Sequence, residues 1–98
     1  MARVVWNYEI NPEGGMVLLP ICAKLVAFDI QNRTPMVWAE VDPNEGETER
    51  RWFAVYGTGH EIPEQESGFS TRRMELRHRF TCQDGASVWH LYEDINYE

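Results

Sequence analysis

The sequence predicts an all-β protein, a small antiparallel sandwich or barrel of about seven strands with little helix. Apolar side chains recur at every second position in several segments, and no segment repeats them with the 3.6-residue period of a helix. Turn-forming residues separate these segments and no crossover helix connects them, which favours antiparallel pairing. The 98 residues suit one domain, 1–98, and we expect residues 94–98 to form a loose tail.

The expected strands follow one another with short turns between them. The first ends at the turn 11–15, where Pro12 fixes φ and two glycines permit positive φ, and Pro20 stops the second. An Asp-Pro pair ends the fourth strand before an acidic loop, and Asp84-Gly85 marks a hairpin before the last. The strands are 4–10, 16–19, 24–31, 36–41, 51–56, 74–81 and 87–93.

Alternation also assigns side chains to faces of these strands. Along 74–81, strict alternation places Arg77 and Arg79 on one face and His78 and Phe80 on the other. One face of each strand is expected to fill the core. The expected core residues are Val26, Phe28, Ile30, Val37, Val41, Phe53, Val55 and Leu91.

Composition excludes several classes of protein. The formal charge of −7 opposes general nucleic-acid binding, which needs a cationic surface to displace counterions. No run approaches the roughly 18 apolar residues of a membrane-spanning helix, and the N-terminus does not have the pattern of a signal peptide. Cys22 and Cys82 have no metal-finger spacing, so we expect two reduced thiols in a soluble intracellular protein.

Several sequence blocks, taken in order, resemble a family of small bacteriophage-encoded proteins of unknown function. They are Val-Trp-Asn-Tyr-Glu at 5–9, Ala-Lys-Leu-Val at 23–26, Val-Trp-Ala-Glu-Val-Asp-Pro at 37–43, Tyr-Gly-Thr-Gly-His at 56–60 and Val-Trp-His-Leu-Tyr-Glu at 88–93. The resemblance implies a phage gene, a compact β fold and a place in the cytoplasm of the infected bacterial host. It implies no activity, and the segment 64–79 departs from the family by being longer and more basic.

The turn Gly57-Thr58-Gly59-His60 is the most suggestive local motif. Its glycines expose backbone N–H groups, and Thr58 and His60 add a hydroxyl and an imidazole, which together suit an anion. An acidic chain needs added positive charge to hold a phosphate, and the best source is a strand that carries three arginines. These are Arg73, Arg77 and Arg79. The alternative interpretation is a tight turn whose histidine caps a backbone group, beside a charged edge strand.

No catalytic or metal-binding motif stands out. The histidines at 60, 78 and 90 have no ligand spacing, and nothing in the sequence places Ser70, His60 and Asp84 together as a triad. We therefore expect no catalytic residue, no metal and no cofactor.

Several strands carry apolar groups on both faces, and a single core between two sheets explains the apolar groups on only one face of each strand. Trp38, Trp52 and Tyr56 are the candidate interface residues on the second face. They indicate self-association, most simply as a dimer, although the loop 60–72 could cover the same surface. The expected function is a non-enzymatic binding module, with a host protein or a small anionic ligand as partner and counter-defence as one form. A minor virion or assembly protein is the alternative, and an enzyme ranks third.

Overall fold

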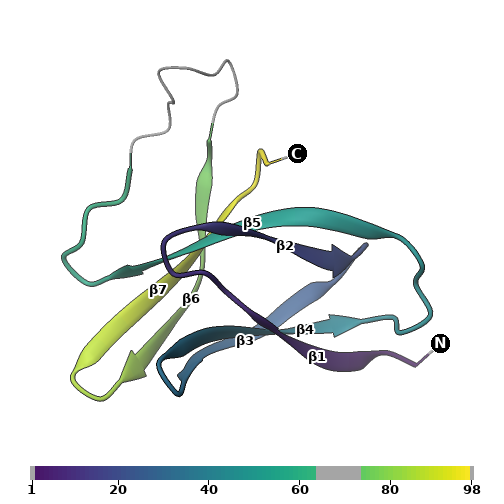
Figure 1. Ribbon diagram of the computed structural model, residues 1–98, viewed down its shortest axis with the longest axis horizontal. Coiled ribbons are helices and arrows are strands. Elements are labelled where there is room, and N and C mark those ends of the chain that lie inside the picture. The colour runs from purple at the N-terminus through teal and green to yellow at the C-terminus, as the bar shows by residue number, and fades with distance from the viewer. Residues whose placement is uncertain (1, 64–73, 98) are drawn as a thin grey trace.

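The computed structural model describes residues 2–63 and 74–97, and the part that it describes contains seven strands and no helix. The predicted all-β class is therefore confirmed (Figure 1). The strands are β1 (Val4–Glu9), β2 (Gly15–Pro20), β3 (Lys24–Gln31), β4 (Thr34–Val41), β5 (Thr48–Gly57), β6 (Leu76–Asp84) and β7 (Ser87–Asp94). A helix long and apolar enough to cross a membrane is absent from these described ranges.

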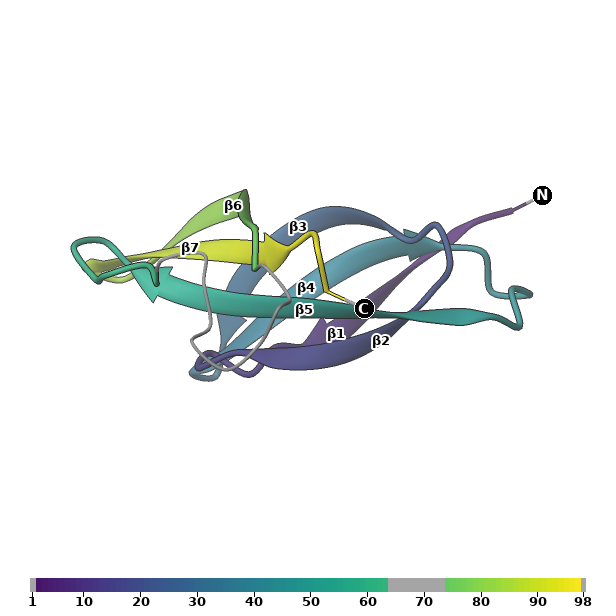
Figure 2. The same cartoon turned by 90° about the horizontal axis from the view of Figure 1, so that it is seen from above.

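The strands form two antiparallel sheets, one of three strands in the order β1-β4-β3 and one of four in the order β2-β5-β7-β6. The chain crosses between the sheets after β1, after β2 and after β4, and Figure 2 shows them as two layers. β3–β4 and β6–β7 pair as hairpins with two-residue loops. Positive φ at Asn32, Arg33 and Gly85 provides the backbone twist that such loops require.

The core lies between the two sheets and follows the alternation of the sequence. In β4, every second residue is buried from end to end. Six expected core residues are buried, and Ile30 packs partly against them. The six are Phe28, Val37, Val41, Phe53, Val55 and Leu91. Sequence alternation did not identify Ile10, Leu19, Ala23 and Ala39, which belong to the same cluster.

The assignment of Val26 to the core is wrong, because this side chain is 39% exposed. The register with β4 shifts between Leu25 and Ala27, which marks a β-bulge at Val26. One extra residue reverses the alternation, so Leu25 packs against the core before the bulge and Phe28 after it.

Hydrogen bonds hold the C-terminal segment against the sheet beyond residue 93, where the sequence predicts the start of a loose tail. Asp94 ends β7 and is buried, and its Oδ1 accepts the backbone N–H groups of Glu75 and Asn96. The N–H of Ile95 donates to the carbonyl of Glu75. The expected loose tail therefore does not begin at residue 94.

Candidate functional site

The outer face of the four-stranded sheet gathers aromatic and histidine side chains. Phe53, Val55 and Leu91 point into the core, so the residues that alternate with them in β5 and β7 point outward. The register places Tyr56 opposite His90 and places Tyr92 opposite His78 of β6. We name this surface the aromatic–histidine face. Its members are Trp52, Tyr56, His78, His90 and Tyr92.

Ring contacts hold this face together across three strands. Tyr56 and Tyr92 meet edge to face with centroids 5.6 Å apart, and His78 meets Tyr92 in the same way at 5.4 Å. Ala54, opposite Tyr92 in the register, is buried beneath this surface. Burial, with a smaller effect from the neighbouring Tyr92, raises the pKa of the Tyr56 phenol. Tyr56 is therefore a neutral hydroxyl at physiological pH.

A chain of side-chain hydrogen bonds borders the same rings. His90 lies 2.8 Å from Thr58 Oγ1 through Nε2 and 2.8 Å from Thr81 Oγ1 through Nδ1. Thr81 Oγ1 also lies 2.8 Å from His78 Nε2. Each of these bonds needs one donor and one acceptor, so the rotors and tautomers along the chain are coupled to one another. These hydrogen bonds fix the orientation of the His78 and His90 rings in the unbound protein.

The turn at Gly57–His60 uses its own N–H groups. Gly57 N–H donates to His60 Nδ1 over 3.1 Å, and His60 N–H donates to the Gly57 carbonyl over 3.0 Å. Thr58 N–H donates to the Val88 carbonyl, and the ring of His60 packs on Trp89. These donors are engaged within the chain, which favours the alternative in which the histidine caps a backbone group.

The arginine strand does not lie beside this turn. Gly57 pairs with Trp89, whereas Arg77 pairs with Glu93, four residues further along β7 or about 13 Å at the usual rise of a strand. Arg79 contacts Glu93 at the same distant level, and Arg73 lies outside the described residues. Among the described residues, one chain therefore does not bring the turn together with Arg77 or Arg79, and anion binding at the turn stays a prediction.

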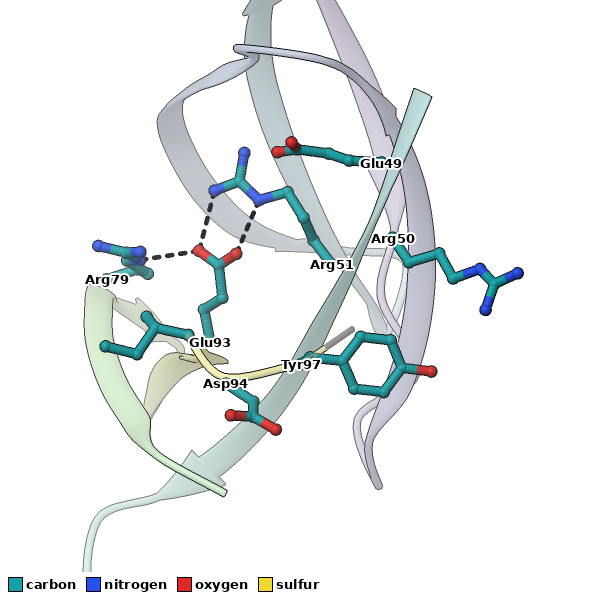
Figure 3. A pocket seen from close by; sticks show the side chains of 8 residues that line it. Glu49, Arg50, Arg51, Arg79, Glu93, Asp94 and Tyr97 are labelled. Atoms are coloured by element: carbon teal, nitrogen blue, oxygen red, sulfur yellow. Dashed lines mark hydrogen bonds and ion pairs between the residues drawn. The ribbon is translucent and has the colours of Figure 1, made fainter. Parts of the chain in front are cut away.

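Glu93 lies between two of the arginines on the inner face of the sheet (Figure 3). Its carboxylate accepts Arg51 Nε at 2.7 Å and Nη2 at 2.9 Å, and it also accepts Arg79 Nε at 2.9 Å. Arg51 Nη1 donates to the carbonyl of Ala23. Burial acts to raise the pKa of Glu93, but the hydrogen bonds and charges of the two guanidinium groups outweigh it and hold that pKa below its ordinary value.

A surface hollow opens beside this cluster, but its charges balance. Three arginines and three carboxylates line it. They are Arg50, Arg51, Arg79, Glu49, Glu93 and Asp94. Figure 3 shows the Arg50 side chain directed away from Glu93. Because Glu93 already engages both of its arginine neighbours, we assign the cluster a role in joining strands rather than in binding.

The three expected interface aromatics do not share one surface. Trp38 is half-buried on the outer face of the three-stranded sheet, because Val37 and Ala39 on either side of it are fully buried. Trp52 and Tyr56 lie on the outer face of the other sheet, and the ring of Trp52 lies against Gly14. A single self-complementary patch cannot include both faces.

Strict alternation along 74–81 is also wrong, and the reason is a second bulge. The register with β7 shifts between His78 and Phe80, so Phe80 packs against the core while His78 lies opposite Tyr92 on the outer face. Sequence reasoning therefore missed the contact between His78, Thr81 and His90. It also missed the Glu93 cluster, because no motif links Arg51 to a carboxylate 42 residues away.

Candidates for catalysis or metal binding are scattered or fall outside the description. Within residues 2–63 and 74–97, no group of three or more His, Cys, Asp or Glu side chains could hold a metal ion. Ser70 of the conceivable triad lies outside these ranges. Cys22 and Cys82 are both free thiols, and burial raises the pKa of Cys82.

Fold and surface together define a small two-sheet β-sandwich with aromatic and histidine rings gathered on one outer face. The chain belongs to a family described as a domain of unknown function, DUF7352, whose sequence profile matches residues 1–98. No curated protein and no solved structure matches the chain.

Proposed function

We propose that this protein is a non-enzymatic binding module whose aromatic–histidine face docks on a partner protein. The observation that supports this most is the chemistry of the face: five ring side chains from three adjacent strands gather on one surface. The centres of protein interfaces are depleted in charge and enriched in aromatic residues. A phosphate-bearing ligand usually needs several cations, and Arg50, two residues before Trp52 on the same face of β5, is one cation beside the rings.

Two further features suit a protein partner. Met16 and Leu18 of β2 are 45% and 53% exposed; Met16 lies opposite Trp52 and extends the apolar surface, and Leu18 lies opposite Arg50 at its border. The ring contacts and the hydrogen-bond chain from Thr58 to His78 hold the face in one arrangement. A preorganised surface loses less conformational entropy when it binds.

The biological setting of the proposal comes from the resemblance of the sequence blocks to small phage proteins. In that setting, the chain acts in the cytoplasm of the infected bacterial host as an accessory protein, and a counter-defence factor that binds a host protein is the specific form. A minor virion or assembly protein is the alternative, and it predicts that the chain co-purifies with phage particles.

The test compares variants of the face with a matched control. Tyr56→Ala alters the face and Leu18→Glu alters the exposed apolar surface beside it, whereas Val26→Glu places the same charge on an exposed apolar position of the other sheet. A host protein that co-purifies with the wild type should be lost with both face variants and retained with Val26→Glu. Calorimetry with that purified host protein should then show binding by the wild type and Val26→Glu and weaker or no binding by the other two variants. Equal binding by all four proteins, or equal loss in the control, would contradict the proposal.

A further inference from the structure

The free edge of β1 is the most exposed strand surface in the described part of the chain. β1 pairs with β4 on one side only, and five of its six residues are exposed. Val4, Val5 and Trp6 are 36%, 53% and 45% exposed, so the edge is apolar as well as open. Such an edge is a template for pairing with another strand.

The hydrogen bonding of β1 shows which backbone groups this edge presents. Ile10 N–H donates to the carbonyl of Pro35, which lies opposite it across the β1–β4 ladder. In an antiparallel ladder, hydrogen-bonded pairs alternate with pairs whose backbone groups point the other way. The even-numbered residues of β1 therefore bond to β4. The odd-numbered residues of β1, which are Val5, Asn7 and Glu9, direct their N–H and C=O groups to the free edge, and Arg3 directly before β1 has the same parity.

The other edges are protected in ways that β1 is not. β3 and β6 each contain a bulge, carry charged side chains and contact one another across the two sheets. β2 ends on Pro20, which has no N–H to donate. The β1–β4 register is unbroken, and β1 contains neither proline nor lysine. Of the devices that usually block edge-to-edge pairing, β1 thus has only one charged side chain, Glu9 at its end.

We propose that β1 is the interface between two copies of this chain, which pair antiparallel about a two-fold axis at Trp6. Three strands from each copy then form one continuous six-stranded sheet. Val5 pairs with the partner's Asn7, and Arg3 pairs with the partner's Glu9. Trp6 meets the partner's Trp6 in a non-hydrogen-bonded pair, where cross-strand side chains lie closest.

Two features select this register: which residues have free backbone groups, and which side chains carry opposite charges. Both members of a hydrogen-bonded pair must be odd-numbered, because only those residues have free backbone groups. An axis at Val5 would place Arg3 opposite Asn7, and an axis at Asn7 would place Val5 opposite Glu9. The axis at Trp6 pairs all four free-edge residues with one another and places Arg3 opposite Glu9. In the single chain Arg3 reaches over β4 to Glu40 and the Cys22 carbonyl, so its guanidinium must turn toward the free edge to meet the partner's carboxylate.

The backbone test uses Asn7→Pro, with Asn7→Ala as its matched control. Proline removes an N–H that β4 does not use, so the single chain keeps its ladder, whereas the pair of copies loses a hydrogen bond on each side of the axis. Sedimentation equilibrium from low to high micromolar should show dimers for the wild type and Asn7→Ala, and monomers for Asn7→Pro. A wild type that stays monomeric over this range, or an Asn7→Pro variant that dimerises like the wild type, would overturn the proposal.

The register test uses two charge reversals, each shown to be folded by far-UV circular dichroism. Arg3→Glu and Glu9→Arg each place like charges opposite one another in their own dimer and should dimerise more weakly than the wild type. In a mixed dimer, one copy is acidic at both exchanged positions and the other is basic at both, so each cross-strand pair joins opposite charges. Native mass spectrometry of the mixture should therefore show mainly the mixed dimer, and a random distribution of the two variants would exclude the axis at Trp6.

A further variant separates this proposal from the proposed function. Tyr56→Ala alters the aromatic–histidine face on the other sheet, so it should leave the dimer intact while it weakens capture of the partner protein. Loss of the dimer in this variant would contradict the placement of the interface at β1. Each of the two proposals can therefore be disproved without affecting the other.

Discussion

At the scale of single residues, Glu93 joins more segments than its position in β7 suggests. Through Arg51 and Arg79 its carboxylate connects β5, β6 and β7, and Arg51 extends the connection to the carbonyl of Ala23 before β3. The Arg51 and Glu93 side chains are only 14% and 7% exposed, so solvent screens their ion pair weakly. Removing the carboxylate would leave a largely buried guanidinium without its counter-charge.

Glu93→Gln should therefore lower the free energy of unfolding by on the order of 3 kcal/mol at neutral pH. Arg77→Gln is the control, because its pair with Glu75 is 3.7 Å long and more than half exposed at both side chains, and such pairs contribute about 0–1 kcal/mol. The folded state lowers the pKa of Glu93, so its stabilisation is present above the ordinary glutamate pKa and is lost as the pH falls through the folded-state value.

Urea unfolding at a series of pH values measures both effects. Below about pH 4.3 the unfolded chain takes up the proton first, so wild-type stability should fall more steeply with acid than that of Glu93→Gln. Parallel curves for the two proteins would show that Glu93 does not have a lowered pKa.

At the scale of elements, close packing makes one glycine essential at the end of β5. A Cβ atom on Gly57 would lie 2.8 Å from His60 Cε1 and 3.1 Å from Trp89 Cζ3, both closer than ordinary contact. The ring of His60 has little room to move, since its Nδ1 accepts Gly57 N–H and the ring packs on Trp89. Gly57 is therefore needed because no side chain fits between the backbone and the rings of His60 and Trp89.

Gly57→Ala should destabilise the protein by about 1–3 kcal/mol, the usual cost of an overpacked site. Gly46→Ala is the control, because a Cβ at Gly46 meets no atom within 4 Å and its φ is not in the left-handed region. Thermal unfolding followed by circular dichroism measures both variants. Equal melting temperatures for the two would contradict the packing argument.

At the scale of the whole molecule, the order of the strands joins the two sheets into one unit. The chain enters the three-stranded sheet with β1, moves to the other with β2, returns for β3 and β4 and then completes the second sheet. Residues from both sheets, such as Val37 and Phe53, belong to one buried cluster. Neither sheet can bury its inner face without the other, so we expect cooperative unfolding.

Tryptophan fluorescence can test this, because each sheet contains two tryptophans. A Trp52→Phe, Trp89→Phe variant keeps only the reporters in the three-stranded sheet, Trp6 and Trp38, and the reciprocal variant reports on the other sheet. Within each variant, the urea midpoint from fluorescence should coincide with the midpoint from far-UV circular dichroism. Separate midpoints would show that the sheets unfold independently.

Period-two alternation alone determined the fold class, the seven strands and most of the core, because one apolar face in each strand must be buried wherever the sheets pack. Only the tertiary structure decided the faces beyond each bulge, since the extra residues at Val26 and Arg79 follow from pairing with the neighbouring strand. The same holds for the candidate sites. Pairing between strands far apart in the chain gathers the aromatic–histidine face, links Arg51 to Glu93 and leaves β1 with a free edge.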